Sequence, residues 1–260
     1  MSRQLPLLLA FLAGTAAPAA GQEAEGKDHE VIQVTPPDVP DTGPRPDLEA
    51  VAKAIVERTN AFRAEQKRSP VTTNEKLTKT AQEFASFMAK SDKYGHTADH
   101  RRPAERAKAR EYDYCVVLEN IAYAFDSRGF SADKLTTEFV TGWENSPGHR
   151  RNMLDPDATE TGVAVARSEK TGHYYAVQMF GRPKSAAIEF RVENRTGEAV
   201  TYTLGDREFS LKPRYTRTHT LCRSTKLTFA AIKDAPAKTP NSGDHYVITG
   251  DEGNVRLKKQ

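Results

Sequence analysis

A chain of 260 residues is long enough for one large domain or two smaller ones, each with a hydrophobic core. Its 38 basic and 35 acidic residues nearly balance, and the net charge of +3 gives no general argument for binding nucleic acid or a membrane. The basic run from Arg101 to Arg110 is interrupted by Glu105, which favours a solvated helix face over a phosphate-binding patch.

The N-terminus has the order of features found in secretory signal peptides. Arg3 precedes an apolar run from Leu5 to Ala16, and small residues follow. We therefore predict a signal peptide over residues 1–21, cleaved after Ala19 or Gly21, rather than an uncleaved anchor, because the apolar run is short for a bilayer. No later segment is apolar enough to span a membrane, so the expected location is extracellular or periplasmic.

Residues 22–46 are predicted to form a linker. The segment is acidic, has few large apolar side chains and contains Pro36, Pro37, Pro40, Pro44 and Pro46. Such a composition is expected to bury too little surface to offset the entropy lost on ordering. Its prolines should keep it semi-extended.

Residues 47–183 combine helical and strand patterns. We expect helices from Asp47 to Arg68, from about Asn74 to before Tyr94, from Pro103 to Arg110, and from Ser131 to about Glu144. Asp47 and Ser131 are suited to cap the first and last of these helices. The pair Pro147-Gly148 is expected to break the last helix and form a tight turn. Residues 160–167 and 174–180 are expected to form an antiparallel hairpin.

Residues 184–260 change pattern again and predict a small all-β module, a sandwich or partial barrel. The strand-like runs are 188–192, 200–204, 209–211, 216–221, 227–231 and 246–249. No catalytic motif occurs in this part of the sequence. Packing or binding is therefore its expected role.

The two cysteines, Cys115 and Cys222, allow two interpretations. In an exported protein they could form a disulfide that ties the two domains together. They could equally be two buried free thiols, because the sequence does not give the Cα separation that a disulfide requires.

Several ordered motifs within residues 50–183 resemble the CAP superfamily of SCP-like extracellular proteins, most closely its bacterial branch. This family includes cysteine-rich secretory proteins, venom allergens and plant pathogenesis-related proteins. The motifs are Thr59–Arg63, Leu77–Ala81, Gly95–Thr97, Glu119–Ala122, Trp143 with Asn145–Arg150, and Tyr174 through Phe180. The resemblance implies an α+β fold, a three-layer α-β-α sandwich. It also implies a cavity lined by two histidines and two glutamates, which in some members hold a divalent metal such as zinc.

By this resemblance the candidate cavity residues are His96, Glu119, His149 and Glu144. Glu119 lies within an apolar run, and a carboxylate buried there needs a partner, which supports a cavity role independently. Leu118 stands where the family has glycine, so a different local backbone is expected there.

Each of these assignments has an alternative. His96 could be a surface histidine like the nearby His100, and Glu119 could point outward from an edge strand; we favour the cavity for both. His173 precedes Tyr174 in a sequence that resembles a family histidine signature, but only His149 has the expected strands downstream, so His173 is expected in the hairpin turn. Glu144 directly follows Trp143, whereas the family glutamate lies a few positions further on, where this chain has Ser146. It could face the cavity or be a surface charge at the helix end.

Three functions remain open from the sequence. The first is a secreted binding protein that recognises a lipid, glycan or peptide ligand through the cavity and an adjacent groove. Tyr94, Tyr123, Tyr174 and Tyr175 could line such a groove, but for most of them we favour amphipathic residues at the boundary of the core. The second is a metal-dependent hydrolase acting on peptide or cell-wall material, since two imidazoles and two carboxylates suit zinc. The third is a structural envelope protein. No His-Glu-x-x-His or Gly-x-Ser-x-Gly motif is present, and neither cysteine has a catalytic context.

Overall fold

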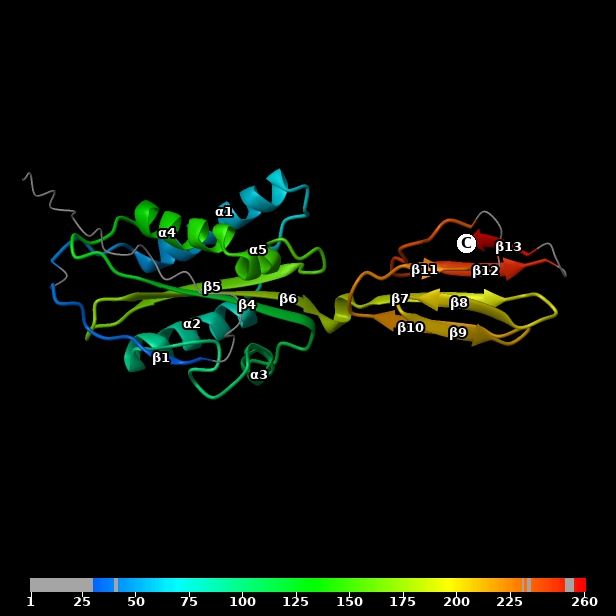
Figure 1. The fold of residues 1–260 in the computed structure, drawn as a ribbon, viewed down its shortest axis with the longest axis horizontal. Coiled ribbons are helices and arrows are strands. Elements are labelled where there is room, and N and C mark those ends of the chain that lie inside the picture. Colours follow the sequence, from blue (N-terminus) through cyan, green and yellow to red (C-terminus); the bar gives the residue numbers. More distant parts are fainter. Residues whose placement is uncertain (1–29, 40–41, 231, 233–234, 251–254) are drawn as a thin grey trace, which may run out of the picture.

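The protein consists of a mixed α/β domain followed by an all-β domain (Figure 1). The computed structural model describes residues 30–39, 42–230, 232, 235–250 and 255–260. The predicted signal peptide over residues 1–21 lies outside these. Within them, no helix has both the length and the apolar character needed to cross a membrane.

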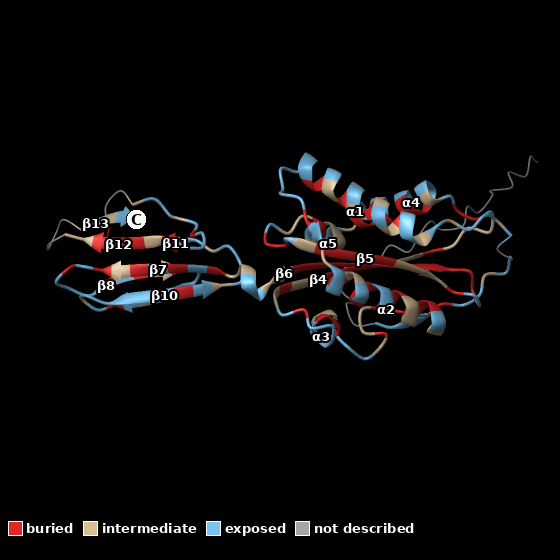
Figure 2. Ribbon diagram, turned by 180° about the vertical axis from the view of Figure 1, so that it is seen from behind, coloured by how far each residue is buried: buried red, intermediate tan, exposed pale blue. Residues whose placement is uncertain are grey.

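The first domain has three layers, as predicted, with a four-stranded sheet between two layers of helices (Figures 1 and 2). The sheet order is β2-β5-β6-β4, with strands β2 (Thr72–Thr73), β4 (Tyr114–Ala124), β5 (Glu160–Arg167) and β6 (Tyr174–Pro183). Strands β4, β6 and β5 are antiparallel, and β2 runs parallel to β5. One face is covered by α1 (Leu48–Glu65), α4 (Ala132–Asn145) and α5 (Pro147–Met153). The other face is covered by α2 (Glu75–Ser91) and α3 (Pro103–Ala109).

The long helices begin where the sequence predicts. The side chains of Asp47, Asn74 and Ser131 accept hydrogen bonds from free backbone N–H groups in the first turns of α1, α2 and α4. Each such cap typically contributes about 1 kcal/mol. These helix starts are therefore encoded locally.

The expected tight turn at Pro147 is wrong. Helix α4 ends at Asn145, but Pro147 is the first residue of the short helix α5. Proline is well suited to this position because its missing N–H would have no intrahelical partner there. His149 consequently lies within a helix, not at the exit of a turn.

Part of the predicted linker packs on the first domain. Strand β1 (Ile32–Gln33) pairs antiparallel with β3 (Lys93–Tyr94), and the backbone N–H of Val34 donates to the carbonyl of Asp92 at 2.7 Å. The Val34 side chain joins the hydrophobic core beneath α2. Val34 is the one buried residue within 30–39, and Val31 and Ile32 are 40% and 39% exposed, so this part of the segment buries little surface, as expected, although its β-branched residues form a strand.

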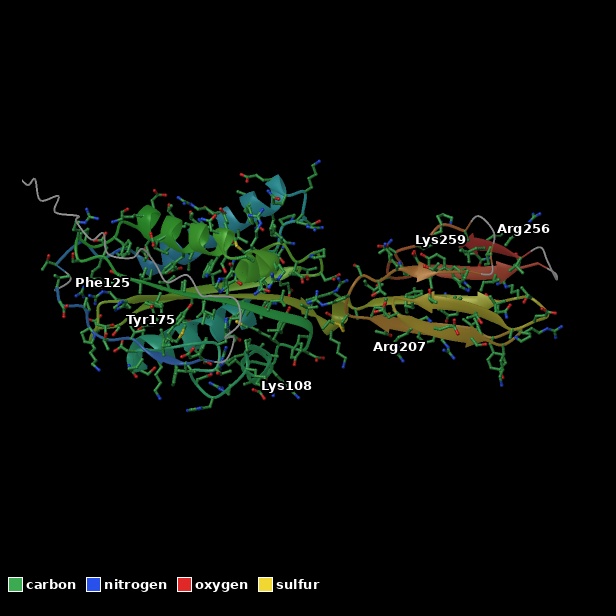
Figure 3. The ribbon with its side chains drawn as sticks, in the orientation of Figure 1. Lys108, Phe125, Tyr175, Arg207, Arg256 and Lys259 are labelled. Atoms are coloured by element: carbon green, nitrogen blue, oxygen red, sulfur yellow. A yellow bond between two sulfur atoms is a disulfide. The ribbon has the colours of Figure 1, made fainter. Side chains whose placement is uncertain are left out.

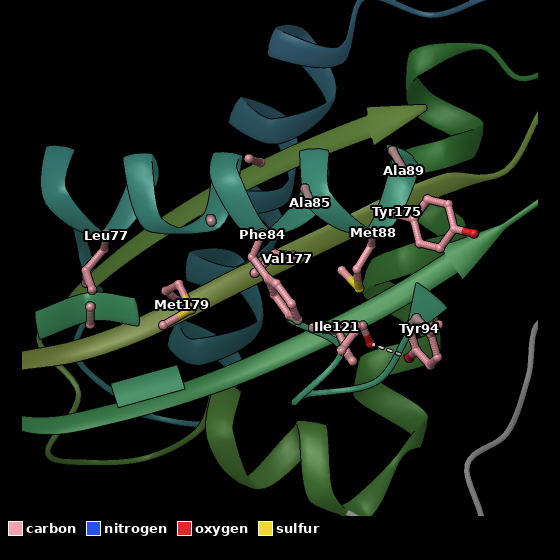
Figure 4. Packing of buried hydrophobic residues seen from close by; sticks show 14 of the residues in the cluster. Leu77, Phe84, Ala85, Met88, Ala89, Tyr94, Ile121, Tyr175, Val177 and Met179 are labelled. Carbon is pink, nitrogen blue, oxygen red and sulfur yellow. Dashed lines mark hydrogen bonds between the residues drawn. The ribbon is translucent and has the colours of Figure 1, made fainter. Parts of the chain in front are cut away.

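The central sheet separates two hydrophobic cores. Alternate residues of β4 face opposite layers, so Ile121 packs with α2 residues such as Phe84 and Met88, shown in Figure 4, while Ala122 packs with α1 and α4. Glu119 is two residues before Ile121. Its side chain therefore faces the layer of α2 and α3.

The C-terminal domain is a two-sheet sandwich, as its sequence predicts. The sheets have the orders β10-β7-β12-β13 and β11-β8-β9. After the short 3-10 turn Lys184–Ala186, the strands are β7 (Ile188–Asn194), β8 (Val200–Leu204), β9 (Arg207–Leu211), β10 (Thr216–Leu221), β11 (Leu227–Thr228), β12 (His245–Thr249) and β13 (Arg256–Lys259). Strand β13 was not predicted, because its residues are mostly charged.

A disulfide and a polar cluster join the two domains. Cys115 in β4 is bonded to Cys222, which follows β10, and this settles the alternative that the sequence left open. Beside it, Asp157 Oδ1 accepts hydrogen bonds from the backbone N–H and the hydroxyl of Ser224, both at 2.9 Å. Asp155 Oδ2 accepts one from Arg223 Nη1 at 2.7 Å. The second domain is thus anchored to the loop that precedes β5 as well as to β4.

The disulfide should stabilise the protein, because it joins residues 107 positions apart and restricts the unfolded chain. The double variant Cys115→Ser/Cys222→Ser should lose about 2–4 kcal/mol of unfolding free energy, measured by urea denaturation. Reductant should destabilise the wild type by a similar amount and leave the double variant unaffected. Equal stability of the oxidised wild type and the double variant would contradict this expectation.

Candidate functional site

The carboxylate of Glu119 is buried and has two partners. Its side chain is 1% exposed. Arg106 Nη2 from α3 donates to both carboxylate oxygens, at 2.8 Å and 2.7 Å, and His96 Nδ1 lies 2.8 Å from Oε1. The expectation that a glutamate in this apolar strand needs a partner is therefore confirmed.

Arg106 links three parts of the domain. Its Nη1 donates to Asp99 Oδ1 and to the Arg101 carbonyl, both at 2.7 Å, and its Nη2 also donates to the His96 carbonyl at 3.0 Å. The guanidinium carbon lies 3.6 Å from the centre of the Phe84 ring of α2, within the range of a cation–π contact. The loop 96–101 is thereby held against β4 and α2.

The basic run forms the expected helix with a largely exposed face, but Arg106 lies on its buried side. The side chain of Arg106 is 3% exposed, and Ala107 is fully buried beside it. Pro103 opens α3, and Glu105 Oε2 accepts a hydrogen bond from the Arg102 backbone N–H at 2.7 Å, which fixes the first turn. The sequence does hold a signal for this arginine, because a buried Glu119 requires a cation and the small residue Ala107 lets α3 approach the sheet.

His96 is the more accessible member of the group, with a side chain 21% exposed. A carboxylate only accepts hydrogen bonds, so Nδ1 of His96 is the protonated nitrogen in this contact. The preceding Gly95 has φ 147°, and a Cβ there would lie 2.8 Å from the Glu30 carbonyl oxygen. The close passage of the N-terminal segment therefore requires glycine before His96.

Backbone carbonyls on the outer edge of β4 accept hydrogen bonds from side chains. The Glu119 carbonyl accepts from Asn152 Nδ2 at 3.1 Å, and the Ile121 carbonyl accepts from Trp143 Nε1 at 3.0 Å and from the Tyr94 hydroxyl at 3.2 Å. Unpaired carbonyls of an edge strand would otherwise need water or another strand. Trp143 thus has a structural role, and it holds the strand that carries Glu119.

The other two predicted ligands, His149 and Glu144, lie on α5 and α4. His149 is tied to β4 through its backbone, whose carbonyl accepts from Asn120 Nδ2 at 3.2 Å. Glu144 lies near the end of α1, and burial, followed by the charge of Glu65, raises the pKa of its carboxyl. Among the described residues, no three His, Cys, Asp or Glu side chains are grouped closely enough to hold a metal ion.

The fit to a metal is poor at Glu119 itself. Arg106 Nη2 lies within 2.8 Å of both carboxylate oxygens, so a divalent cation bound there would be repelled by the guanidinium charge. Of the predicted set, the structure brings His96 and Glu119 into direct contact. Arg106 is the member that the sequence analysis missed.

His173 precedes β6 at the β5–β6 connection, as expected, but it is buried among aromatic rings. Its ring centre is 5.2 Å from that of Phe125 and 5.7 Å from that of Tyr123. Figure 3 shows Phe125 and Tyr175 at the same end of the domain. Burial lowers the pKa of His173, while the charge of Asp92 opposes this shift.

The tyrosines considered for a ligand groove are mainly core residues. Tyr94, Tyr174 and Tyr175 are buried, and Tyr123 packs against the same core from its partly buried position. This agrees with their interpretation as amphipathic residues at the boundary of the core.

Comparisons with known proteins identify a relationship for the first domain. The family model of the cysteine-rich secretory protein family, CAP, matches residues 56–180. The uncharacterized protein YkwD of Bacillus subtilis (strain 168) is 31% identical over 136 residues, which are 52% of this chain and 49% of that protein. The chain thus matches about half the length of this curated relative.

Two solved structures have similar folds over the same share of the chain. An outer surface protein from Borrelia burgdorferi is 19% identical and has a TM-score of 0.47, covering 53% of this chain and 96% of that one. An extracellular protein containing an SCP domain from Bacillus anthracis is 21% identical and has a TM-score of 0.43, covering 52% of this chain and 41% of that one.

Removing the positive charge of Arg106, which neutralises Glu119, should destabilise the first domain strongly. Arg106→Met leaves a buried carboxylate without its cation, so we expect a loss of about 3–5 kcal/mol. Arg110→Met, on the same segment, removes a half-exposed pair with Glu83 and should cost at most about 1 kcal/mol. Trp143, the single tryptophan, reports unfolding of this domain by fluorescence in urea. Equal losses in the two variants would contradict the assigned role of Arg106.

His173 should make the first domain less stable in acid. Its pKa is lowered on folding, so its contribution to stability is present above its ordinary value of 6.5 and is lost as the pH falls through its folded value. The variant His173→Phe should therefore lose less stability than the wild type between pH 7.5 and pH 5, again measured by Trp143 fluorescence in urea. His100→Asn changes an exposed histidine and should behave like the wild type. Parallel losses in all three proteins would refute this assignment.

Proposed function

Residues 56–180 belong to the CAP family, and from that premise we propose that this protein is an exported binding protein. It recognises an extracellular or envelope ligand, a lipid, glycan or peptide, at the site formed by His96 and Glu119. The activity proposed is recognition, with no obligatory chemical step. Fold membership alone does not fix a function, so the proposal depends on the site.

The observation that carries the proposal is the contact between His96 and the buried Glu119. A partly exposed imidazole is held at Nδ1 by a carboxylate, which is itself fixed by Arg106. A polar group fixed in this way loses little freedom when it meets a ligand. The loop that carries His96 is also pinned through its backbone carbonyl.

Export is supported by two independent features. The signal-peptide pattern of residues 1–21 predicts secretion. The disulfide between Cys115 and Cys222 is of the kind that persists in oxidising compartments outside the cytosol. The names of the similar B. burgdorferi and B. anthracis proteins place those proteins at the outer surface and outside the cell.

Recognition is preferred over the metal-dependent hydrolase. A zinc hydrolase needs about three protein ligands and an open coordination position. The described residues contain no group of three suitable side chains, and Glu119 is committed to Arg106. No observation in the described part of the chain supplies the hydrolase with another source of activated water.

The test compares two histidines of the same loop region. Mature protein is incubated with purified peptidoglycan sacculi and, separately, with vesicles containing phosphatidylglycerol, and bound protein is measured by sedimentation. The wild type and His100→Asn should be retained by at least one of these materials, and His96→Asn should lose at least about tenfold in affinity, the scale of one lost charge-assisted hydrogen bond. His100 is the matched control because it is exposed and has φ 63°, which asparagine tolerates.

Retention of His96→Asn at the wild-type level would show that the site does not bind these materials. Failure of the wild type to bind either material would remove the support for envelope recognition. Folding of each variant is checked by Trp143 fluorescence, so that a loss of binding is not confused with unfolding.

A further inference from the structure

We infer that Arg106 supplies the permanent positive charge of this site and makes it independent of any bound metal ion. The inference goes beyond the proposed function, because it concerns the resting state of the site and holds whatever ligand binds there. It rests on the contacts of Arg106 with Glu119, Asp99 and Phe84.

The guanidinium performs the electrostatic task that a divalent ion would perform at a buried carboxylate. It lies against both oxygens of Glu119 at hydrogen-bonding distance and also neutralises the buried Asp99. Arginine is always charged, and its planar donors match the geometry of carboxylates. Glu119 thus has its counter-charge without an ion from solution.

A metal ion on Glu119 would lie beside the Arg106 cation, and the two positive charges would repel each other. Displacing Arg106 instead would separate it from one of its two buried carboxylates, because its side chain is enclosed by α2, α3 and the loop 96–101. Breaking a buried ion pair usually reduces an equilibrium constant by roughly a hundred- to a thousand-fold or more. Zinc binding at Glu119 should be weakened by about this factor.

Nearby side chains do not restore the zinc affinity lost at Glu119. His96 directs Nδ1 at Glu119 itself, and Glu144 lies beside Glu65 near the end of α1. Within the described ranges, no third His, Cys, Asp or Glu completes a site. The arrangement therefore favours a metal-free site.

Zinc titration by isothermal calorimetry tests this inference on the full mature chain without an affinity tag. The proteins are the wild type, Arg106→Met, Arg106→Lys, and the control Arg110→Met. Arg106→Met removes the charge but keeps a long side chain, whereas Arg106→Lys restores a cation without the guanidinium, whose Nη2 and Nη1 reach Glu119 and Asp99. Each protein is also measured with His96→Asn added, which identifies binding at this site.

We expect no zinc binding that depends on His96 in the wild type, in Arg106→Lys or in Arg110→Met. Arg106→Met should gain measurable zinc binding, weak because His96 and Glu119 supply two ligands, and this binding should disappear with His96→Asn. One tightly bound zinc in the wild type, lost with His96→Asn, would overturn the inference. A folded Arg106→Met variant that gains no zinc would also overturn it, because Arg106 would not then be what excludes the metal.

The titration remains decisive if Arg106→Met does not fold. His96-dependent zinc binding by the wild type would still overturn the inference, and Arg106→Gln, which keeps hydrogen-bond donors but has no charge, replaces Arg106→Met as the test of Arg106. The result is also separate from the ligand test, because a metal-free site can bind or fail to bind sacculi and vesicles.

Discussion

The first domain depends on the neutralisation of one buried carboxylate. Glu119 stands in the middle of an apolar strand, where a lone charge would be prohibitively unfavourable. Its counter-charge comes from Arg106 on a short helix that could not be stable alone, so α3 is itself held by contacts to Phe84 and to the loop 96–101. One ion pair therefore determines how the whole segment between β3 and β4 packs, and it places His96 at the surface.

Strand β4 connects this ion pair to the rest of the molecule. It lies at an edge of the sheet, and its outward carbonyls are satisfied by Trp143, Tyr94 and Asn152. Four residues before Glu119, Cys115 bonds the same strand to the C-terminal domain. A strand fixed along its edge and at one end gives a rigid base for the site. The second domain is thus attached next to the site, not through a free linker.

Local features of the fold could be predicted from the sequence, and the missed features depend on contacts between distant residues. Helix starts follow from capping side chains such as Asp47 and Asn74, and the β5–β6 hairpin follows from apolar runs around a turn. The pairing of β1 with β3 was missed because its partner lies about 60 residues away. The burial of Arg106 was missed for the same reason. A basic residue among other basic residues looks solvated until the strand that carries Glu119 is placed beside it.

A metal ion and an arginine that neutralise a buried carboxylate stabilise the fold under different conditions. A metal ion that neutralises a carboxylate contributes its binding energy only when the ion is present, and it makes the fold sensitive to chelators and to acid. A guanidinium is covalently part of the chain and stays protonated over the physiological range, so its contribution is present from the moment of folding. Under the proposed export, the surroundings are not controlled by the cell, and a counter-charge within the chain does not depend on metal supply. In the proposed metal-free site His96 is not a metal ligand, and its partly exposed ring is the group proposed to meet the ligand.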